Sequence, residues 1–382
     1  MKPRWAFGLT FVGAVLVAGG IFYGLVVLLD FKGINSTAKL DAKTLFDLVK
    51  LSFGVVAGAG ALVALVVAYR RQRVDEAGAH REATRLHTER FSQAVDKLGS
   101  DSPAVRLGGV HALAGLADDA PDDNLRQTCI DVLCAYLQLP FTPDPGDDPA
   151  HQEEHHRYLA FRKVRHTILR LIGDHYRRPK GTHRSWQGCD LDLTGVTIDG
   201  SIDFSGATFS RGTVSFSGAT FSDGRVSFDK ATFSDDTVSF HCATFSGSLV
   251  LFEGATFSEG ELSFAGATFS GGIVSFEGAT FSGGIVPFRD VAFSGGTVVF
   301  DYVKFISGAV DFGSASFSGG TVDFRGTMFS GGTVSFHGVR FLGSTVDFGW
   351  ASGLDPRGLL DAVGTPVPAT VALPSEWLPP NP

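Results

Sequence analysis

The stretch "GATFSGGIVSFEGATFSGGIVPF", residues 266–288, decides the fold because it states almost the same motif twice. Its phenylalanines are separated by alternating steps of seven and five residues, so the unit repeats every twelve. A fixed period of this kind is the sequence signature of a repeat architecture, in which each unit stacks on its neighbours.

The repeat forms two columns of phenylalanine, one from Phe204 to Phe348 and the other from Phe209 to Phe341. Together they hold 25 of the 34 phenylalanines. An aliphatic residue stands two positions before each member of the first column, and usually Ala before the second. This alternation predicts short strands with one buried face, joined by turns of Gly, Ser and Asp. The predicted core comprises Phe204, Phe209, Phe216, Phe221, Phe228, Phe233, Phe240, Phe245, Phe252, Phe257, Phe264, Phe269, Phe276, Phe281 and Phe288.

The units "VSFSG" and "ATFSD" resemble those of the pentapeptide-repeat proteins. The resemblance implies an all-β, right-handed, four-sided β-helix with one five-residue unit on each face, over residues 181–350. Here two residues are inserted after every second unit, which gives 5 + 7 = 12. A 12-residue coil is too tight for two phenylalanines and their neighbours, so we expect coils of 24 and about six of them between residues 202 and 348. The residue between the two inward-facing positions of a strand, such as Ser263, is expected to point outward, so Ser263→Ala should cost almost no stability.

The first seventy residues differ from the repeat in composition, because they contain two long runs without charged residues. Residues 5–29 and 51–69 carry no charge. Each run is long enough to cross a hydrocarbon core of about 30 Å. A cleaved signal peptide is the alternative for the first run, but that run is too long for a usual signal core. We therefore expect a transmembrane hairpin over residues 1–73, followed by an α-helical region over 74–180.

The charges flanking these runs predict the orientation. Seven Lys and Arg residues lie in the N-terminus and in residues 70–85, against four in the intervening loop. This asymmetry favours cytoplasmic N- and C-termini in a two-pass protein of the cell membrane. Close helix packing is predicted at the GxxxG glycines, which leaves open a homo-oligomer. These glycines are Gly20, Gly24, Gly54 and Gly58.

The helical region has two short amphipathic helices within residues 102–138 that resemble a single HEAT- or armadillo-type pair. A linker rich in Pro and Asp, residues 139–150, precedes a further helix to about residue 177. Residues 351–382 are expected to form a C-terminal cap and a Pro-rich tail. We expect the helical region, with its more varied surface, to be the docking site.

One short sequence in the chain resembles a catalytic motif. "HQEEH", His151 to His155, fits the HxxEH pattern of inverted zinc peptidases. Zinc needs a third protein ligand, and the chain soon becomes repeat, so a solvated helix start is the favoured interpretation. The four cysteines have no paired spacing, and no phosphate-binding loop is present. We expect no cofactor, no metal and no enzymatic activity.

These observations favour a membrane-anchored, non-catalytic protein that acts as a cytoplasmic interaction scaffold or sensor for an unknown protein partner. A mimic of duplex DNA that binds a type II topoisomerase is the first alternative, and a zinc hydrolase the second. Residues 199–350 hold 15 acidic and 7 basic residues, a net charge of −8. Six coils stacked about 4.8 Å apart would form a rod roughly 30 Å long. Duplex DNA carries about one charge per 1.7 Å, so the same length of DNA would carry roughly 18 charges, more than twice as many. Nucleic acid is not an expected partner, since the aromatic rings face inward.

Overall fold

A computed structural model describes residues 42–141, 144–146, 148–234 and 237–378, together with Leu16, Gly19, Gly20, Tyr23, Gly24 and Val27. The chain forms two compact units, Met1–Thr84 and Arg85–Pro382. The second unit contains both the helical region and the repeat, so these two parts belong to one compact body.

Helix α2 (Ala42–Leu98) runs without a break through the apolar run at 51–69 and the charged sequence after it. Among the described residues, the segment Val49–Leu98 is the one helix long and apolar enough to cross a membrane, judged by length and composition alone, and its most apolar part is not buried. Most of the first apolar run, residues 5–29, lies outside the described residues, so two membrane-spanning helices stay a prediction.

Three helices follow α2: α3 (Pro103–Asp118), α4 (Asp123–Gln138) and α5 (Gln152–Tyr176), the last preceded by a 3₁₀ turn, η1 (Pro149–His151). Pro103 opens α3, and the Asp122 carboxylate caps α4 by accepting a hydrogen bond from the Leu125 amide at 2.9 Å. Their apolar faces meet in a shared core, in which Leu113, Ile130 and Ile168 are fully buried.

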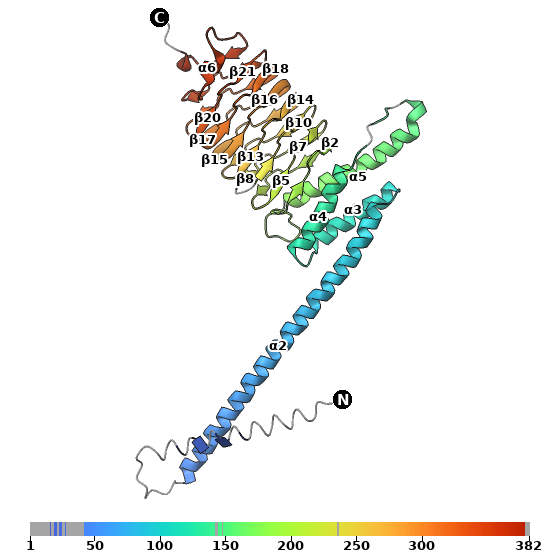
Figure 1. The fold of residues 1–382 in the computed structure, drawn as a ribbon, viewed down its shortest axis with the longest axis vertical. Helices are drawn as coiled ribbons and strands as arrows, with labels where there is room; N and C mark the ends of the chain where they lie inside the picture. The colour runs from blue at the N-terminus through green and yellow to red at the C-terminus, as the bar shows by residue number, and fades with distance from the viewer. Residues whose placement is uncertain are drawn as a thin grey trace. The chain divides into compact units, whose positions relative to one another are not determined.

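The rest of the chain is a β-solenoid of about eight turns, visible in Figure 1 as stacked rungs from green to red. Its strands are β1 (Leu191–Asp192), β2 (Thr197–Ile198), β3 (Ile202–Asp203), β4 (Thr208–Phe209), β5 (Thr213–Ser215), β6 (Thr220–Phe221), β7 (Arg225–Ser227), β8 (Thr232–Phe233), β9 (Thr237–Ser239), β10 (Thr244–Phe245), β11 (Leu249–Leu251), β12 (Thr256–Phe257), β13 (Glu261–Ser263), β14 (Thr268–Ser275), β15 (Thr280–Pro287), β16 (Ala292–Val299), β17 (Lys304–Asp311), β18 (Ser316–Asp323), β19 (Met328–Phe329), β20 (Thr333–Ser335), β21 (Arg340–Phe341), β22 (Thr345–Asp347), β23 (Ser352–Gly353) and β24 (Val371–Ala372).

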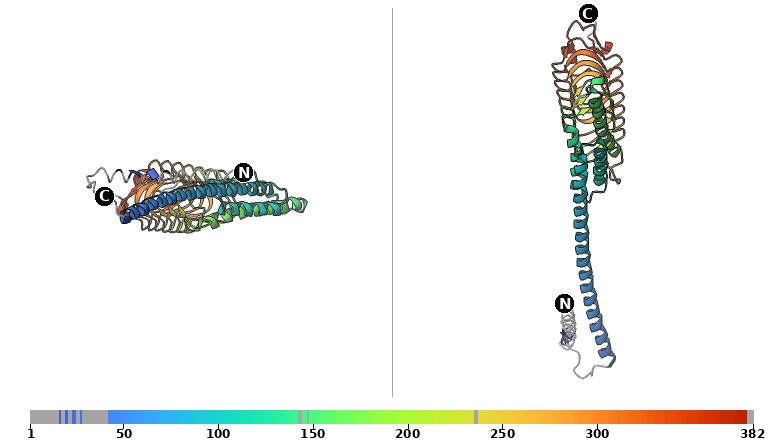
Figure 2. Two further views of the ribbon diagram at one scale, coloured as in Figure 1. Left: turned by 90° about the horizontal axis from the view of Figure 1, so that it is seen from below. Right: turned by 90° about the vertical axis from the view of Figure 1, so that its right-hand side faces the viewer.

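Strand register establishes the coil size. Val214 pairs with Val238, and Val238 pairs with Leu262, in parallel ladders, so one 24-residue coil separates equivalent positions. Four strands, β9 to β12, follow one another before β13 lies on β9, so each turn has four sides. In Figure 2 the right-hand view shows these rungs stacked one upon another. The expectation of 24-residue coils is confirmed, while the right-handed sense stays a prediction.

The phenylalanine core follows from this register. Each of the fifteen predicted core phenylalanines is at most 3% exposed. Phe264 stacks face to face on Phe288, with 4.7 Å between ring centroids, whereas Phe252 and Phe276 meet it edge-on at 81° and 80° across the interior. Ser263, expected to point outward, is nevertheless only 8% exposed, because it lies between equivalent positions on the adjacent turns.

One corner of the repeat is a tight turn. The Ala219 amide donates to the Phe216 carbonyl at 3.0 Å, and Gly218 between them has a φ of 64°. This left-handed backbone suits glycine. Lys230, Tyr302 and Trp350 nevertheless occupy the same turn position with φ values of 56°, 56° and 59°. The serine after the second phenylalanine column has a role too: the Ser258 hydroxyl donates to the Phe233 carbonyl on the neighbouring turn at 3.2 Å.

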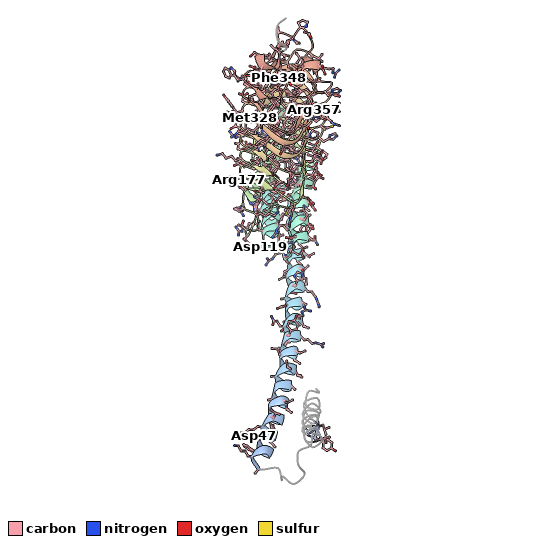
Figure 3. All side chains as sticks on the ribbon, turned by 90° about the vertical axis from the view of Figure 1, so that its left-hand side faces the viewer. Asp47, Asp119, Arg177, Met328, Phe348 and Arg357 are labelled. Atoms are coloured by element: carbon pink, nitrogen blue, oxygen red, sulfur yellow. The ribbon has the colours of Figure 1, made fainter. Side chains whose placement is uncertain are left out.

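The solenoid is longer than the six coils expected, because strands form before and after the clear repeat. β1 begins at Leu191, and β24 pairs with β22 near the C-terminus. A short helix, α6 (Leu359–Val363), and the 3₁₀ turn η2 (Ser375–Trp377) close that end, where the Trp377 ring packs edge-on against Phe348 at 5.9 Å. Figure 3 labels Phe348 at this end and Arg177 near the opposite one.

Candidate functional site

The N-terminal end of the solenoid is covered by helix α5. The Tyr176 ring lies edge-on to Phe204, with centroids 5.7 Å apart, and 5.5 Å from the Phe209 centroid. Gly173 fits against the solenoid backbone so closely that a β-carbon there would lie 2.6 Å from the Asp203 carbonyl oxygen. The helix therefore shields phenylalanines that would otherwise face water, and it creates two hollows beside it.

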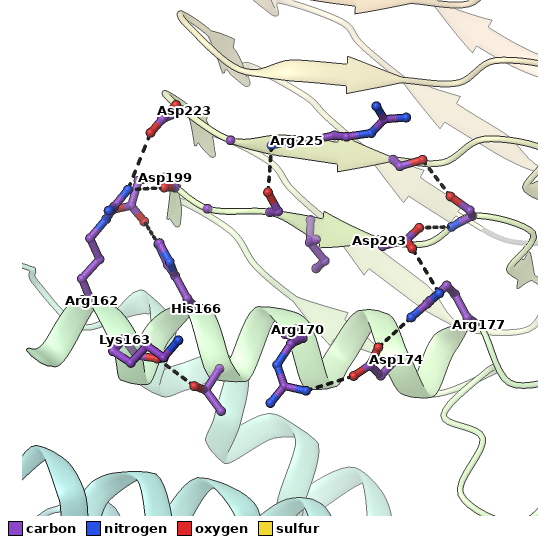
Figure 4. Close-up of a pocket in the computed structure, with 17 residues that line it drawn as sticks. Arg162, Lys163, His166, Arg170, Asp174, Arg177, Asp199, Asp203, Asp223 and Arg225 are labelled. Atoms are coloured by element: carbon purple, nitrogen blue, oxygen red, sulfur yellow. Dashed lines mark hydrogen bonds and ion pairs between the residues drawn. The ribbon is translucent and has the colours of Figure 1, made fainter. Parts of the chain in front are cut away.

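The first hollow, the junction groove, has a volume of about 730 Å³ and lies between α5 and the first turns of the solenoid. It is lined by Arg162, Lys163, His166, Thr167, Arg170, Asp174, Arg177, Asp199, Gly200, Ser201, Ile202, Asp203, Ser205, Asp223, Gly224, Arg225 and Ser227. Figure 4 shows that charged side chains from the helix and the strands point toward one another across it.

Most charges in the junction groove are paired. Arg162 Nε lies 2.7 Å from Asp199 Oδ2, and His166 Nε2 lies 3.2 Å from Asp199 Oδ1. Burial opposes the charge on Asp199, but the hydrogen bonds from His166 and Arg162 prevail and lower its pKa to about 2. Farther along, Arg177 bridges Asp174 and Asp203 at 2.7 and 3.1 Å. The groove is thus a clasp that fastens α5 to the solenoid.

The second hollow, the aromatic–arginine pocket, lies within the helical region and has a volume of about 520 Å³. Its lining consists of Arg106, Tyr136, Leu139, Pro140, Phe141, Pro145, Glu154, Arg157, Tyr158, Phe161 and Arg165. The Phe141 and Tyr158 rings stack with centroids 5.1 Å apart. Two guanidinium groups lie over aromatic rings of the pocket. The guanidinium carbon of Arg106 is 4.6 Å from the Phe161 centroid, and that of Arg165 is 4.8 Å from the Phe141 centroid.

Arg165 in this pocket is buried and forms no ion pair with a described carboxylate, although the charge of Asp199 favours its protonated form. The residue is 4% exposed, and its Nη1 and Nη2 donate to the carbonyls of Leu137 and Thr197 at 2.8 and 3.2 Å. Its Nε has no hydrogen-bond partner among the described residues, and no carboxylate of those residues forms an ion pair with the guanidinium. Burial lowers the pKa of Arg165, which is the sign of a cation held at a cost.

The residues singled out from the sequence lie elsewhere. His151 closes η1 and is exposed, while His155 Nδ1 lies 2.7 Å from Asp144 Oδ1. Within the described ranges no group of three His, Cys, Asp or Glu side chains is placed to hold a metal ion. At Gly20, Gly24, Gly54 and Gly58 an added β-carbon would meet no described atom within 4 Å, so their role in helix packing stays a prediction.

Comparison with known proteins concerns the solenoid. Residues 193–241 match a family model described as pentapeptide repeats, with nine copies. These residues are pentapeptide repeats. The matched stretch spans about two turns, and the strands continue beyond it in the same 24-residue register. No curated protein and no solved structure matches the chain.

Sequence reasoning missed the aromatic–arginine pocket. Arg157, Phe161 and Arg165 recur every four residues, which places them along one face of α5. That spacing is visible in the sequence. The opposite wall is not, because Phe141 belongs to the linker after α4 and meets α5 only through the tertiary fold.

Proposed function

We propose that this protein is a non-catalytic, membrane-anchored scaffold whose solenoid presents a docking surface to a protein partner. The observation that carries the proposal is a pair of exposed aromatic residues at strained positions. Tyr302 is 58% exposed and Trp350 is 81% exposed, and both have left-handed backbone with φ of 56° and 59°.

The turn position that these residues occupy is held by Gly278 and Gly326 on adjacent turns of the same edge. A bulky residue in this conformation costs roughly 1–2 kcal/mol, so aromatic side chains here reduce stability without filling the core. Strain of this kind is common at functional positions, and exposed Trp and Tyr are frequent anchors at protein interfaces.

The register sets the spacing of the two aromatics. Tyr302 and Trp350 are two turns apart along one edge of the solenoid. Since neighbouring strands lie about 4.8 Å apart, two turns correspond to roughly 10 Å. The Tyr302 ring leans over Gly326 between them, and Leu354 nearby in sequence is 82% exposed. These exposed apolar side chains lead us to favour the C-terminal turns over the helical region as the docking surface.

The alternatives have less support. The acidic charge of the solenoid is partly neutralised by ion pairs, for example between Arg325 and both Asp301 and Asp323 at 3.4 and 2.6 Å, which reduces its similarity to a DNA backbone.

Membrane anchoring by α2 is supported by the length and apolar composition of its segment Val49–Leu98. The scaffold hypothesis needs no catalytic group.

Site-specific photocrosslinking in native membranes tests the proposal. A benzophenone amino acid would replace Trp350 in one variant, Leu159 of the helical region in a second and Ile285 of the mid-solenoid in a third; Leu159 and Ile285 are 42% and 57% exposed. We expect a discrete protein adduct at Trp350 that is absent at Ile285. Adducts at Leu159 alone would move the docking surface to the helical region, and equal or absent labelling at all three positions would contradict the proposal.

A further inference from the structure

We propose that the aromatic–arginine pocket binds a small organic anion, in which a planar ring carries a carboxylate. The inference goes beyond the scaffold function and does not depend on it. It rests on three features of the pocket: cationic groups that form no ion pair with a described residue, aromatic walls and a volume suited to a small molecule.

The cationic groups distinguish this pocket from the junction groove. Arg162 and Arg177 in the groove each bind a described carboxylate, at 2.7 and 3.1 Å. In the pocket, Arg106, Arg157 and Arg165 form no ion pair with a described residue, although one acid, Glu154, shares the lining. Among the described lining residues, three guanidinium groups stand against one carboxylate, and Asp199, outside the lining, is near enough to favour the charged form of Arg165.

Arg165 makes this imbalance costly. Two of its nitrogens donate to backbone carbonyls, and the Leu137 carbonyl belongs to the last turn of α4, where the helix dipole provides a partial negative charge. The partial charge at the helix end is about half an elementary charge. The two carbonyls leave Nε of Arg165 without an acceptor among the described residues. A carboxylate in the pocket would place a negative charge beside this buried cation.

Two further arginines are placed to contact such a carboxylate. Arg106 Nη1 donates to Tyr136 Oη at 3.0 Å, and its Nε donates to the Ser100 carbonyl, which fixes the guanidinium and leaves Nη2. Arg157 is exposed and lies with its guanidinium carbon 5.9 Å from the Phe161 centroid. Guanidinium groups match the planar, two-oxygen geometry of a carboxylate.

The walls and the volume favour a ring as the body of the ligand. Phe141, Tyr158 and Phe161 offer aromatic surfaces, and Pro140 and Pro145 add rigid apolar contacts. A planar ring stacks on such surfaces and gains from its contact area. The volume of about 520 Å³ is that of a small-molecule site. Such sites usually enclose roughly 300–1,000 Å³.

Calorimetry on the full chain in zwitterionic nanodiscs tests the inference, with empty nanodiscs as the blank. The probe is naphthalene-2-carboxylate, compared with the neutral naphthalene-2-carboxamide and the non-planar cyclohexanecarboxylate. We expect saturable binding of the first probe that is at least tenfold tighter than that of either other compound. Equal affinity for the carboxamide, or no saturable binding of the carboxylate at millimolar concentration, would overturn the proposal.

Three variants locate the site. Arg157→Gln removes an exposed cation and should weaken naphthalene-2-carboxylate binding about tenfold, the size of one lost charge-assisted hydrogen bond. Arg170→Gln is the matched control on the same helix, because Arg170 is exposed but lines the junction groove, and it should leave the affinity unchanged. Tyr158→Leu should weaken binding through the lost ring contact. Unchanged affinity in Arg157→Gln, or an equal loss in Arg170→Gln, would contradict the assignment.

Discussion

The ring of Phe264 lies face to face on the ring of Phe240, its equivalent on the preceding turn, with 4.9 Å between centroids and 4° between planes. The same relationship continues on the other side to Phe288. Face-to-face stacks therefore run along each side of the solenoid, and edge-on contacts join the sides. Each ring is held between its neighbours, so we expect truncation of one phenylalanine to leave a cavity.

Phe264→Ala is expected to lower the free energy of unfolding by about 3–5 kcal/mol, the range for truncating a buried aromatic side chain. The matched control is Ile285→Ala, which removes an apolar side chain that is 57% exposed. This control should change stability by less than about 0.5 kcal/mol. Urea unfolding followed by circular dichroism measures both. Similar losses in the two variants would contradict a closed aromatic core.

The corner turn provides predictions of opposite sign at two equivalent positions. The backbone φ is 56° at Lys230 and 64° at Gly218. Lys230→Gly should stabilise the protein by up to about 1 kcal/mol, because glycine adopts this left-handed conformation without strain. Gly218→Ala should destabilise it by about 1 kcal/mol. An added β-carbon at Gly218 meets no atom within 4 Å, which leaves backbone strain as the cause. Melting temperatures that shift in the same direction would contradict this account of the turn.

The clasp around Asp199 predicts sensitivity to acid. Its pKa of about 2 lies below the ordinary value of 3.8, so the folded state gains stability that is complete above pH 4 and is lost as the pH falls toward 2. The shift corresponds to about 2 kcal/mol. Asp199→Asn removes this titration. We expect the stability difference between wild type and variant, measured by urea unfolding, to shrink from pH 5 to pH 2.5; a constant difference would count against the clasp.

A second carboxyl group predicts the reverse dependence. Burial, together with a hydrogen bond to Asp323 and the charge of that residue, raises the pKa of Asp301 to about 6. The folded state then holds a proton that the unfolded state releases, so stability falls as the pH rises from 4 to 6 and is level above that range. Asp301→Asn should remove this decline from thermal melts recorded between pH 4.5 and 7.5. A variant that keeps the wild-type slope would exclude Asp301 as its source.

The repeat could be predicted because its pattern of buried and outward side chains depends on residues close together in the sequence. Each phenylalanine has an equivalent one turn away, and the alternation along three residues already determines which side chain faces inward. The ends of the solenoid lack this signal. Arg357 extends one sheet through a bridge to Ser335, and Trp377 closes the core, yet neither belongs to the repeat. The six coils counted from phenylalanine spacing were therefore too few.

The site was harder to predict because its parts come from separate elements. Gly173 and Tyr176 have ordinary helical spacing, and their contact with the first turn of the solenoid depends on how α5 docks there. Similarly, Arg165 alone suggests an exposed helical cation. Its burial becomes apparent only once Phe141 and the Leu137 carbonyl are placed beside it.

Membrane topology is the last prediction, and it concerns the proposed anchor. Arg70, Arg71 and Arg73 follow the apolar part of α2, whereas the preceding loop holds fewer basic residues than the two flanks together, so the solenoid should lie in the cytoplasm. A cysteine in place of Ser36 in a cysteine-free background should react with an impermeant maleimide in intact cells, and one in place of Ile285, which is 57% exposed, should react only after lysis. Removal of residues 1–69 should release the remainder into the soluble fraction. Labelling of the Ile285 position in intact cells would reverse the orientation, and a full-length chain found in the soluble fraction would contradict the membrane anchor itself.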